Sequence, residues 1–170
     1  MDLKKAIRVF PDFPRPGILF RDITPVLKDA ELLNHTLSLL EAELAGVDFD
    51  LVISPESRGF LFGVPISARM GKGFIPARKK GKLPGRTMSK NYFLEYGLDT
   101  IEIHTDAIKP GQKAVIVDDL LATGGTARCI CDIVAELGGE VVRSVFLIEL
   151  DGLGGREALK DTETRSILTY

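Results

Sequence analysis

The sequence predicts an α/β fold in which a mostly parallel central sheet is flanked by helices. Continuous apolar runs at residues 51–53, 114–117 and 141–150 have the length and branching of strands that are buried on both faces. Segments with helical spacing of apolar residues separate these runs, as in a sheet built from crossover units. The chain has 170 residues, of which 45% are hydrophobic and 7% aromatic, and this suits one compact domain spanning residues 1–170.

The first elements are a loop and a helix. Residues 10–25 are punctuated by prolines, which cannot continue a helix, so this stretch is expected to be an irregular loop or cover. Asp29 is a plausible N-cap for an amphipathic helix that ends near Gly46. Its apolar stripe consists of four leucines at spacings of four, three and four: Leu33, Leu37, Leu40 and Leu44. This stripe is expected to pack into the core.

The middle of the chain predicts half of a crossover unit followed by a basic stretch. The strand at 51–53 leads into a polar turn at 54–59 and a helical pattern from residue 60 to about 71. A second apolar segment, residues 73–77, runs into residues 78–91, which hold six Lys or Arg and are expected to be exposed and mobile.

The last third predicts a hairpin and a second crossover unit. Residues 92–104 contain β-prone pieces around a turn at Gly97-Leu98-Asp99. After the strand at 114–117, four apolar residues define one helical face: Ile130, Ile133, Val134 and Leu137. Gly138 and Gly139 are expected to end this helix before the strand at 141–150.

Composition and charge argue against several classes of protein. A formal net charge of -2 offers no global attraction for nucleic acid or anionic lipid. The chain has no apolar run that would span a bilayer or form a signal core, so we expect a cytoplasmic protein that binds neither membrane nor nucleic acid. Cys129 and Cys131 do not have CxxC spacing, and with only two histidines a conventional zinc site is not expected.

The strongest functional signal is the twelve-residue string from Val115 to Thr126. It places Asp118 and Asp119 directly after a buried strand, where open α/β sheets bind ligands. The following residues combine glycines that admit an anion to the backbone with hydroxyl donors and a helix N-terminus. Together they predict a phosphate site, with the two aspartates beside it as acceptors for sugar hydroxyls. The residues of the phosphate site are Ala122, Thr123, Gly124, Gly125 and Thr126. The fragments taken alone also fit an ordinary turn or the acidic strand end of a nucleotide hydrolase.

The whole string resembles the phosphoribosyl pyrophosphate signature of the type I phosphoribosyltransferases. The resemblance extends over nearly the whole chain and is closest to those members that act on adenine. It implies the type I fold, a small N-terminal hood at about residues 1–28 and a flexible β-hairpin lid at about residues 78–104. It also implies a homodimer and Mg²⁺, with the ion held mainly through substrate and water and no protein ligand assigned.

Four further segments carry the resemblance and its site residues. Residues 10–25 match the hood, which implies adenine binding by Leu19, Phe20 and Arg21. Residues 56–59 match the pyrophosphate loop and residues 78–85 the basic loop, which implies pyrophosphate binding by Ser57, Arg58, Arg78, Lys79 and Lys82. Residues 94–97 match the end of the lid, which implies Glu95 as the catalytic acid-base residue and Tyr96 as a lid residue. Without the resemblance, these segments would be interpreted as a surface loop, a surface ion pair, a solvated charge run and an exposed strand.

The reaction implied is transfer of ribose phosphate from phosphoribosyl pyrophosphate to adenine, giving AMP and diphosphate, as in purine salvage. Two alternatives remain. One is a phosphoribosyltransferase for hypoxanthine, guanine or xanthine. The other is a non-catalytic regulator that senses phosphoribosyl pyrophosphate.

Overall fold

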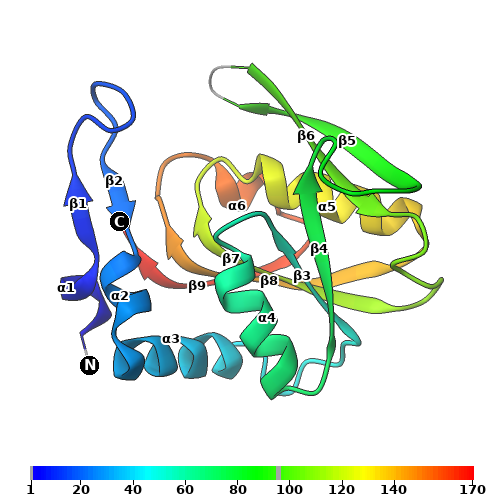
Figure 1. Ribbon diagram of the computed structural model, residues 1–170, viewed down its shortest axis with the longest axis horizontal. Helices are drawn as coiled ribbons and strands as arrows, with labels where there is room; N and C mark the ends of the chain where they lie inside the picture. The colour runs from blue at the N-terminus through cyan, green and yellow to red at the C-terminus, as the bar shows by residue number, and fades with distance from the viewer. Residues whose placement is uncertain (1, 95–96) are drawn as a thin grey trace. The chain divides into compact units, whose positions relative to one another are not determined.

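A computed structural model describes residues 2–94 and 97–170 of the chain. The chain divides into two compact units, residues 1–39 and 40–170. Figure 1 shows the order of the elements along the chain.

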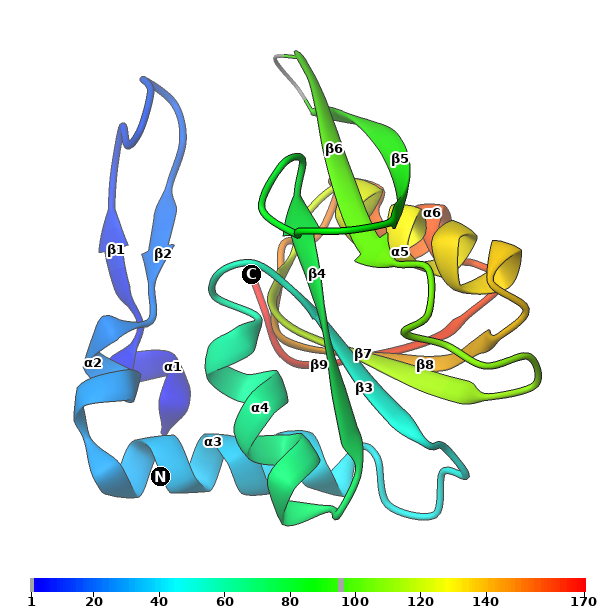
Figure 2. The ribbon, with the colours of Figure 1, turned by 45° about the vertical axis from the view of Figure 1, so that its right-hand side comes forward.

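The first unit is built on a short antiparallel hairpin (Figure 2). Its elements are α1 (Leu3–Ala6), β1 (Arg8–Phe10), β2 (Phe20–Asp22), α2 (Thr24–Lys28) and the start of α3 (Ala30–Ala42). The Arg8 guanidinium donates to Asp22 across the hairpin, with Nε 2.9 Å from Oδ2. The prediction of an irregular loop over residues 10–25 is therefore wrong at its ends, since backbone pairing forms β2 and Pro25 is tolerated in the first turn of α2.

The helix predicted from Asp29 is confirmed as α3. Asp29 Oδ1 accepts the backbone N–H groups of Glu31 and Leu32, both at 3.0 Å, and so caps the first turn. Leu37 and Leu40 of the leucine stripe are buried. The capping residue and the spacing were both visible in the sequence.

The second unit contains a seven-stranded sheet in the order β5-β6-β4-β3-β7-β8-β9. Neighbours from β4 through β3, β7 and β8 to β9 are parallel, whereas β6 pairs antiparallel with both β4 and β5. The mostly parallel sheet is thus confirmed. The strands are β3 (Leu51–Pro55), β4 (Gly73–Lys79), β5 (Thr87–Leu94), β6 (Gly97–His104), β7 (Lys113–Leu121), β8 (Glu140–Glu149) and β9 (Glu163–Thr169).

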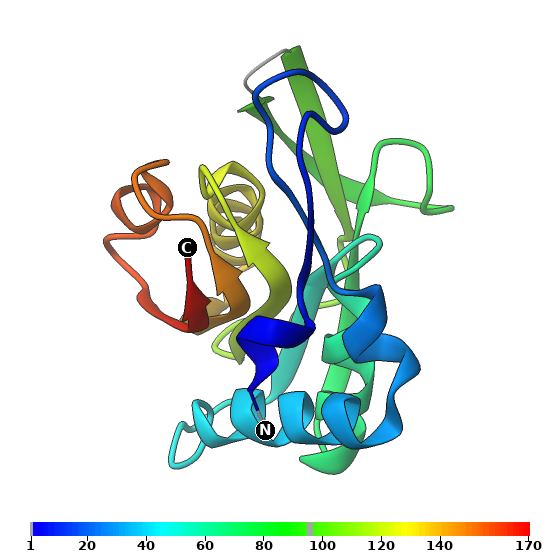
Figure 3. The ribbon, with the colours of Figure 1, turned by 90° about the vertical axis from the view of Figure 1, so that its left-hand side faces the viewer.

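The two long crossover helices lie on opposite faces of this sheet (Figure 3). The connection from β3 through α4 (Phe60–Arg69) leads to β4, and that from β7 through α5 (Gly125–Glu136) leads to β8. Because β3 and β7 are neighbours and their crossovers depart in opposite directions, the sheet has a topological switch point between them. Parallel α/β sheets bind ligands at the carboxyl ends of such strands.

The main core lies between the sheet and α5. The helix contributes Ala127, Ile130, Ile133 and Val134, which face apolar side chains of β3, β4, β6 and β7. Cys129 is buried on the same helix, as expected for a small apolar residue. The helix therefore enters the core immediately after the glycine-rich loop, which fixes the position of that loop.

The structure corrects the prediction for residues 78–104. The loop expected over residues 78–91 is shorter, because β4 extends to Lys79 and β5 begins at Thr87. The turn expected at Gly97-Leu98-Asp99 is instead the start of β6. Antiparallel pairing from Thr87↔His104 to Leu94↔Gly97 stabilises this hairpin through the backbone, so its strands form although the first half of β5 is mostly polar. No helix in the described residues is long and apolar enough to cross a bilayer.

Candidate functional site

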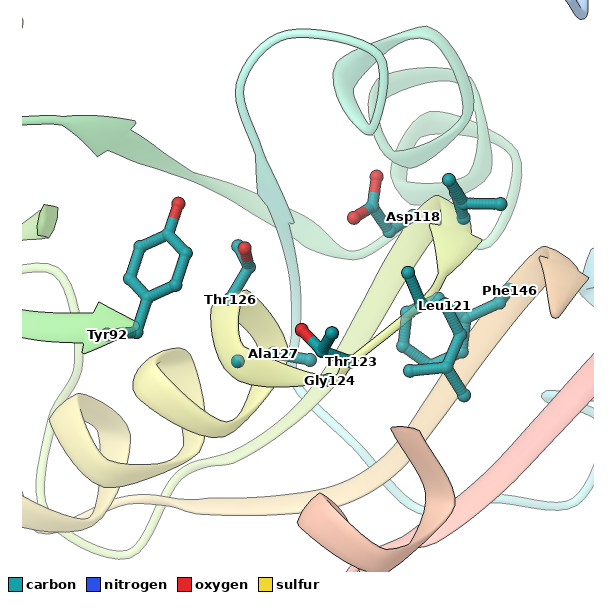
Figure 4. Close-up of a pocket in the computed structure, with 11 residues that line it drawn as sticks. Tyr92, Asp118, Leu121, Thr123, Gly124, Thr126, Ala127 and Phe146 are labelled. Atoms are coloured by element: carbon teal, nitrogen blue, oxygen red, sulfur yellow. The ribbon is translucent and has the colours of Figure 1, made fainter. Parts of the chain in front are cut away.

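A cavity of about 150 Å³ opens above the glycine-rich loop that joins β7 to α5 (Figure 4). Gly124 adopts φ 79°, a left-handed conformation that glycine accepts without a Cβ penalty, and α5 begins at the next residue. Among the described residues, no side chain caps the first turn of α5. Its backbone N–H groups and the positive end of the helix dipole are therefore available to an anion. The cavity is lined by Tyr92, Asp118, Thr126, Ala127, Phe146 and residues 120–125.

The glycine-rich loop packs closely against the backbone at Gly155. A Cβ added at Gly124 would lie 2.8 Å from the carbonyl oxygen of Gly155, and a Cβ added at Gly155 would lie 2.5 Å from that of Ala122. Gly155 begins the short helix α6 (Gly155–Ala158). The two backbone segments thus pass too close to leave room for a Cβ at either glycine. This close packing fixes the position of the loop below the cavity.

Asp118 and Asp119 lie in the carboxyl-terminal half of β7, which continues to Leu121 instead of ending before them as predicted, and the two side chains face different surroundings. Asp118 lines the cavity, and its Oδ1 accepts the backbone N–H of Asp119 at 2.8 Å. Asp119 is only 4% exposed, and its Oδ2 lies 2.9 Å from Nε of Arg58. Gly59 permits this approach, because a Cβ there would lie 2.9 Å from Oδ1 of Asp118. The turn after β3 is therefore packed directly against the acidic end of β7.

Burial makes both carboxylates harder to ionise. Burial, and then the negative charge of Asp119, raise the pKa of Asp118 well above its ordinary value. Burial also raises the pKa of Asp119, while the Arg58 guanidinium opposes that shift. Such a pair is stabilised when positive charge or hydroxyl donors arrive beside it.

The basic residues predicted for pyrophosphate lie on the turn after β3, at the end of β4 and in the loop that follows it. Nε of Arg78 lies 2.7 Å from Oε2 of Glu56, and Nζ of Lys79 lies 3.0 Å from Oδ2 of Asp99. The Nη1 group of Arg78 also donates to the backbone carbonyl of Lys82 at 3.0 Å. Ser57 and Lys82 are exposed. Arg58, Arg78 and Lys79 therefore each have a carboxylate neighbour.

The residues predicted for the base belong to the first unit. There Phe20 lines an apolar pocket together with Phe10, Pro11, Asp12 and Phe13. The rings of Phe13 and Phe20 meet edge to face, with centroids 5.2 Å apart. Of the other two predicted residues, Leu19 is 53% exposed and Arg21 is half-buried, and neither lines this pocket.

Sequence reasoning left out several residues that line the cavity above the glycine-rich loop, among them Tyr92 and Phe146. Their motifs carry no chemical signature, and only the strand pairing brings them to the glycine-rich loop. Glu95 and Tyr96, the predicted catalytic and lid residues, lie outside the described residues. Within the part of the chain that the structure describes, no three His, Cys, Asp or Glu side chains gather into a ready metal site.

A mostly parallel sheet with a cavity over the uncapped start of a helix at its switch point, beside two adjacent carboxylates, is the kind of site that suits a phosphorylated sugar. Comparison with known families identifies the protein further: residues 30–168 match the phosphoribosyl transferase domain. The chain belongs to this family, and the type I fold predicted from the sequence is confirmed.

Within the family, the chain is similar to adenine phosphoribosyltransferases. It is 54% identical to that of Lachnoclostridium phytofermentans over 99% of this chain and 97% of the relative. It is 53% identical to that of Alkaliphilus metalliredigens over the full length of both. The crystal structure of adenine phosphoribosyltransferase from Thermoanaerobacter pseudethanolicus superposes with a TM-score of 0.97 at 51% identity, covering 99% of this chain and 98% of that one. The Saccharomyces cerevisiae enzyme, at 40% identity and TM-score 0.88 over 96% and 94% of the chains, was solved with adenine and an imino-altritol bisphosphate.

Proposed function

We propose that this protein is an adenine phosphoribosyltransferase that converts adenine and phosphoribosyl pyrophosphate to AMP and diphosphate. The observation that supports this most directly is the cavity at the switch point, where an anion site of backbone amides adjoins Asp118. A ribose 5-phosphate satisfies both parts, because its phosphate suits residues 122–126 and its hydroxyls can donate to the carboxylate. The relatives named for adenine supply the identity of the base.

In the proposed mechanism the purine nitrogen displaces diphosphate at the anomeric carbon of the ribose. The phosphate bound at residues 122–126 positions that carbon, and binding energy from this non-reacting group lowers the barrier. Asp118 and Asp119 accept the ribose hydroxyls and favour the positive charge that develops on the sugar. Ser57, Arg58, Arg78, Lys79 and Lys82 stabilise the departing diphosphate, and Glu95 handles the proton on the purine.

Magnesium suits this site on the chemistry of its donors. Oxygen ligands and multiply charged phosphates are what Mg²⁺ prefers, and the cavity carries the carboxylate of Asp118 beside the phosphate loop. When bound with the substrate, the ion supplies positive charge that neutralises the leaving diphosphate.

The first unit is proposed to bind the base. The apolar pocket containing Phe13 and Phe20 offers aromatic faces to a planar ring, with Leu19 and Arg21 on the same segment. Closure of the lid predicted at about residues 78–104, with Tyr96 as a lid residue, would exclude water from the activated sugar. A cytoplasmic homodimer completes the proposal, with neither membrane nor nucleic acid as partner.

A steady-state assay tests the proposal. The purified chain is given Mg²⁺ and phosphoribosyl pyrophosphate with adenine, hypoxanthine, guanine or xanthine, and both nucleotide and diphosphate are measured. Fast turnover of adenine alone supports the proposal. Preference for an oxopurine contradicts the choice of base, and tight binding of phosphoribosyl pyrophosphate without turnover of any base indicates the regulator.

A further inference from the structure

Tyr92 reaches the phosphate cavity from a different part of the fold than the glycine-rich loop. It lies on β5, in the hairpin formed by β5 and β6, and is only 9% exposed because α5 packs against this strand. Figure 4 shows its ring beside Thr126, with the two hydroxyl groups on the same side. Both residues line the cavity.

The hydroxyl of Tyr92 is held by Asp99, which is itself paired with Lys79. It donates to Oδ2 of Asp99, its direct cross-strand partner, at 3.2 Å. The same oxygen of Asp99 lies 3.0 Å from Nζ of Lys79 on β4. Asp99 therefore keeps a cationic partner if Tyr92 turns its proton elsewhere.

The hydroxyl remains a hydrogen-bond donor at neutral pH. Burial raises the pKa of Tyr92 above its usual value, so the phenol stays protonated beside an arriving phosphate. A neutral donor at the rim of an anion site can strengthen anion binding, and unlike a charged donor it needs no partner of opposite charge in the free protein.

We propose that Tyr92 is a further binding residue for the 5-phosphate, which its hydroxyl reaches from the hairpin and which it contacts in place of the Asp99 carboxylate that holds it in the free protein. On ligand binding, the phenolic proton turns from the Asp99 carboxylate to a phosphate oxygen, and the ammonium of Lys79 continues to balance Asp99. The phosphate then touches both the loop at the start of α5 and the hairpin. This inference rests on the proposed placement of the phosphate at residues 122–126.

Tyr92→Phe removes the hydroxyl and keeps the ring that packs in the core. Thr100→Val is the matched control, because Thr100 makes the neighbouring cross-strand hydrogen bond, to Asn91 at 2.8 Å, at an exposed position outside the cavity. Binding of ribose 5-phosphate to the full chain is measured by calorimetry, together with the thermal midpoint of each variant and the KM for phosphoribosyl pyrophosphate.

A hydrogen bond to a charged group contributes about 1.5–3 kcal/mol, so Tyr92→Phe is expected to weaken ribose 5-phosphate binding by about tenfold or more. The KM for phosphoribosyl pyrophosphate should rise in parallel, with Thr100→Val close to wild type in both. Unchanged affinity in Tyr92→Phe, or equal losses in both variants, would overturn the inference while leaving the proposed function intact. Failure of the wild-type chain to bind ribose 5-phosphate would overturn the phosphate site itself, and this inference with it.

Discussion

Replacing Gly155 by alanine tests whether the phosphate loop depends on the backbone contact behind it. The new Cβ would lie 2.5 Å from the carbonyl oxygen of Ala122 and 2.8 Å from Cγ of Leu121. Ordinary contacts begin at 3.4 Å, so the Ala122 carbonyl must move by roughly 0.9 Å or α6 must retreat by a similar distance. Overpacking of this kind costs about 1–3 kcal/mol of folding stability.

The same displacement should weaken phosphate binding, because the amide donors of residues 122–126 move with the loop. A misplacement near 1 Å reduces function by up to about a hundredfold, and we expect the Kd for ribose 5-phosphate to rise by about tenfold or more. Calorimetric titration and urea unfolding of the same preparations measure both effects.

Gly139→Ala provides the control for the loss of stability. Its Cβ would lie 2.8 Å from Cγ2 of Ile108 and 3.1 Å from the carbonyl oxygen of Gln112, and none of these residues lines the cavity. We expect this variant to lose stability and keep wild-type affinity. If Gly155→Ala binds ribose 5-phosphate as tightly as wild type, or if Gly139→Ala loses as much affinity, the argument that Gly155 sets the depth of the loop is refuted.

Three further experiments probe charge in the second unit. Asp118→Asn removes the repulsion between Asp118 and Asp119, so the thermal midpoint should stay level or rise. At the same time kcat/KM should fall by about 10²–10³-fold. A loss of both stability and activity would contradict this expectation. Arg156→Met removes the guanidinium that holds the pKa of Glu149 below its usual value, with Nε–Oε1 at 2.7 Å and Nη2–Oε2 at 2.6 Å. Because that folded-state pKa is lowered, the stabilisation is present above about pH 4.5 and is lost as pH falls through the folded value. Arg156 is 55% exposed, so urea unfolding should show a deficit of only about 1–2 kcal/mol at pH 7 that narrows near pH 3; a deficit independent of pH would count against the pair. Chelation of Mg²⁺ should abolish turnover and leave calorimetric binding of ribose 5-phosphate intact, whereas loss of both would mean that the ion holds the sugar phosphate.

The sequence identified the elements whose apolar pattern is local. The strand at 114–117, the helix containing Ile130 and the capping residue Asp29 are all found where they were predicted. The sequence did not reveal β9, because Glu163–Thr169 is mostly polar, lies at an edge of the sheet and acquires its hydrogen bonds from β8. The start of β5 was missed for the same reason.

A similar distinction applies to the site. The glycine-rich loop was predictable because its glycines, hydroxyls and carboxylates are adjacent in the chain. The ion pair between Arg58 and Asp119 and the approach of Tyr92 were not predictable, since each joins separate strands whose pairing is fixed only by the folded sheet. The contact between Gly124 and Gly155 belongs with them, because neither sequence position shows how closely two backbones pass.

The carboxylate beside each basic residue has a consequence for selectivity in a crowded solution of anions. Arg58, Arg78 and Lys79 already have Asp119, Glu56 and Asp99 as neighbours. A small anion such as inorganic phosphate gains little from any one of them, since it must compete with a partner that is tethered in place. A ligand that presents several phosphates at once, with hydroxyls between them, can contact several of these basic residues together, and Lys79 can use one of its three N–H donors for it while another stays on Asp99. Abundant simple anions should therefore be poor competitors at these basic residues.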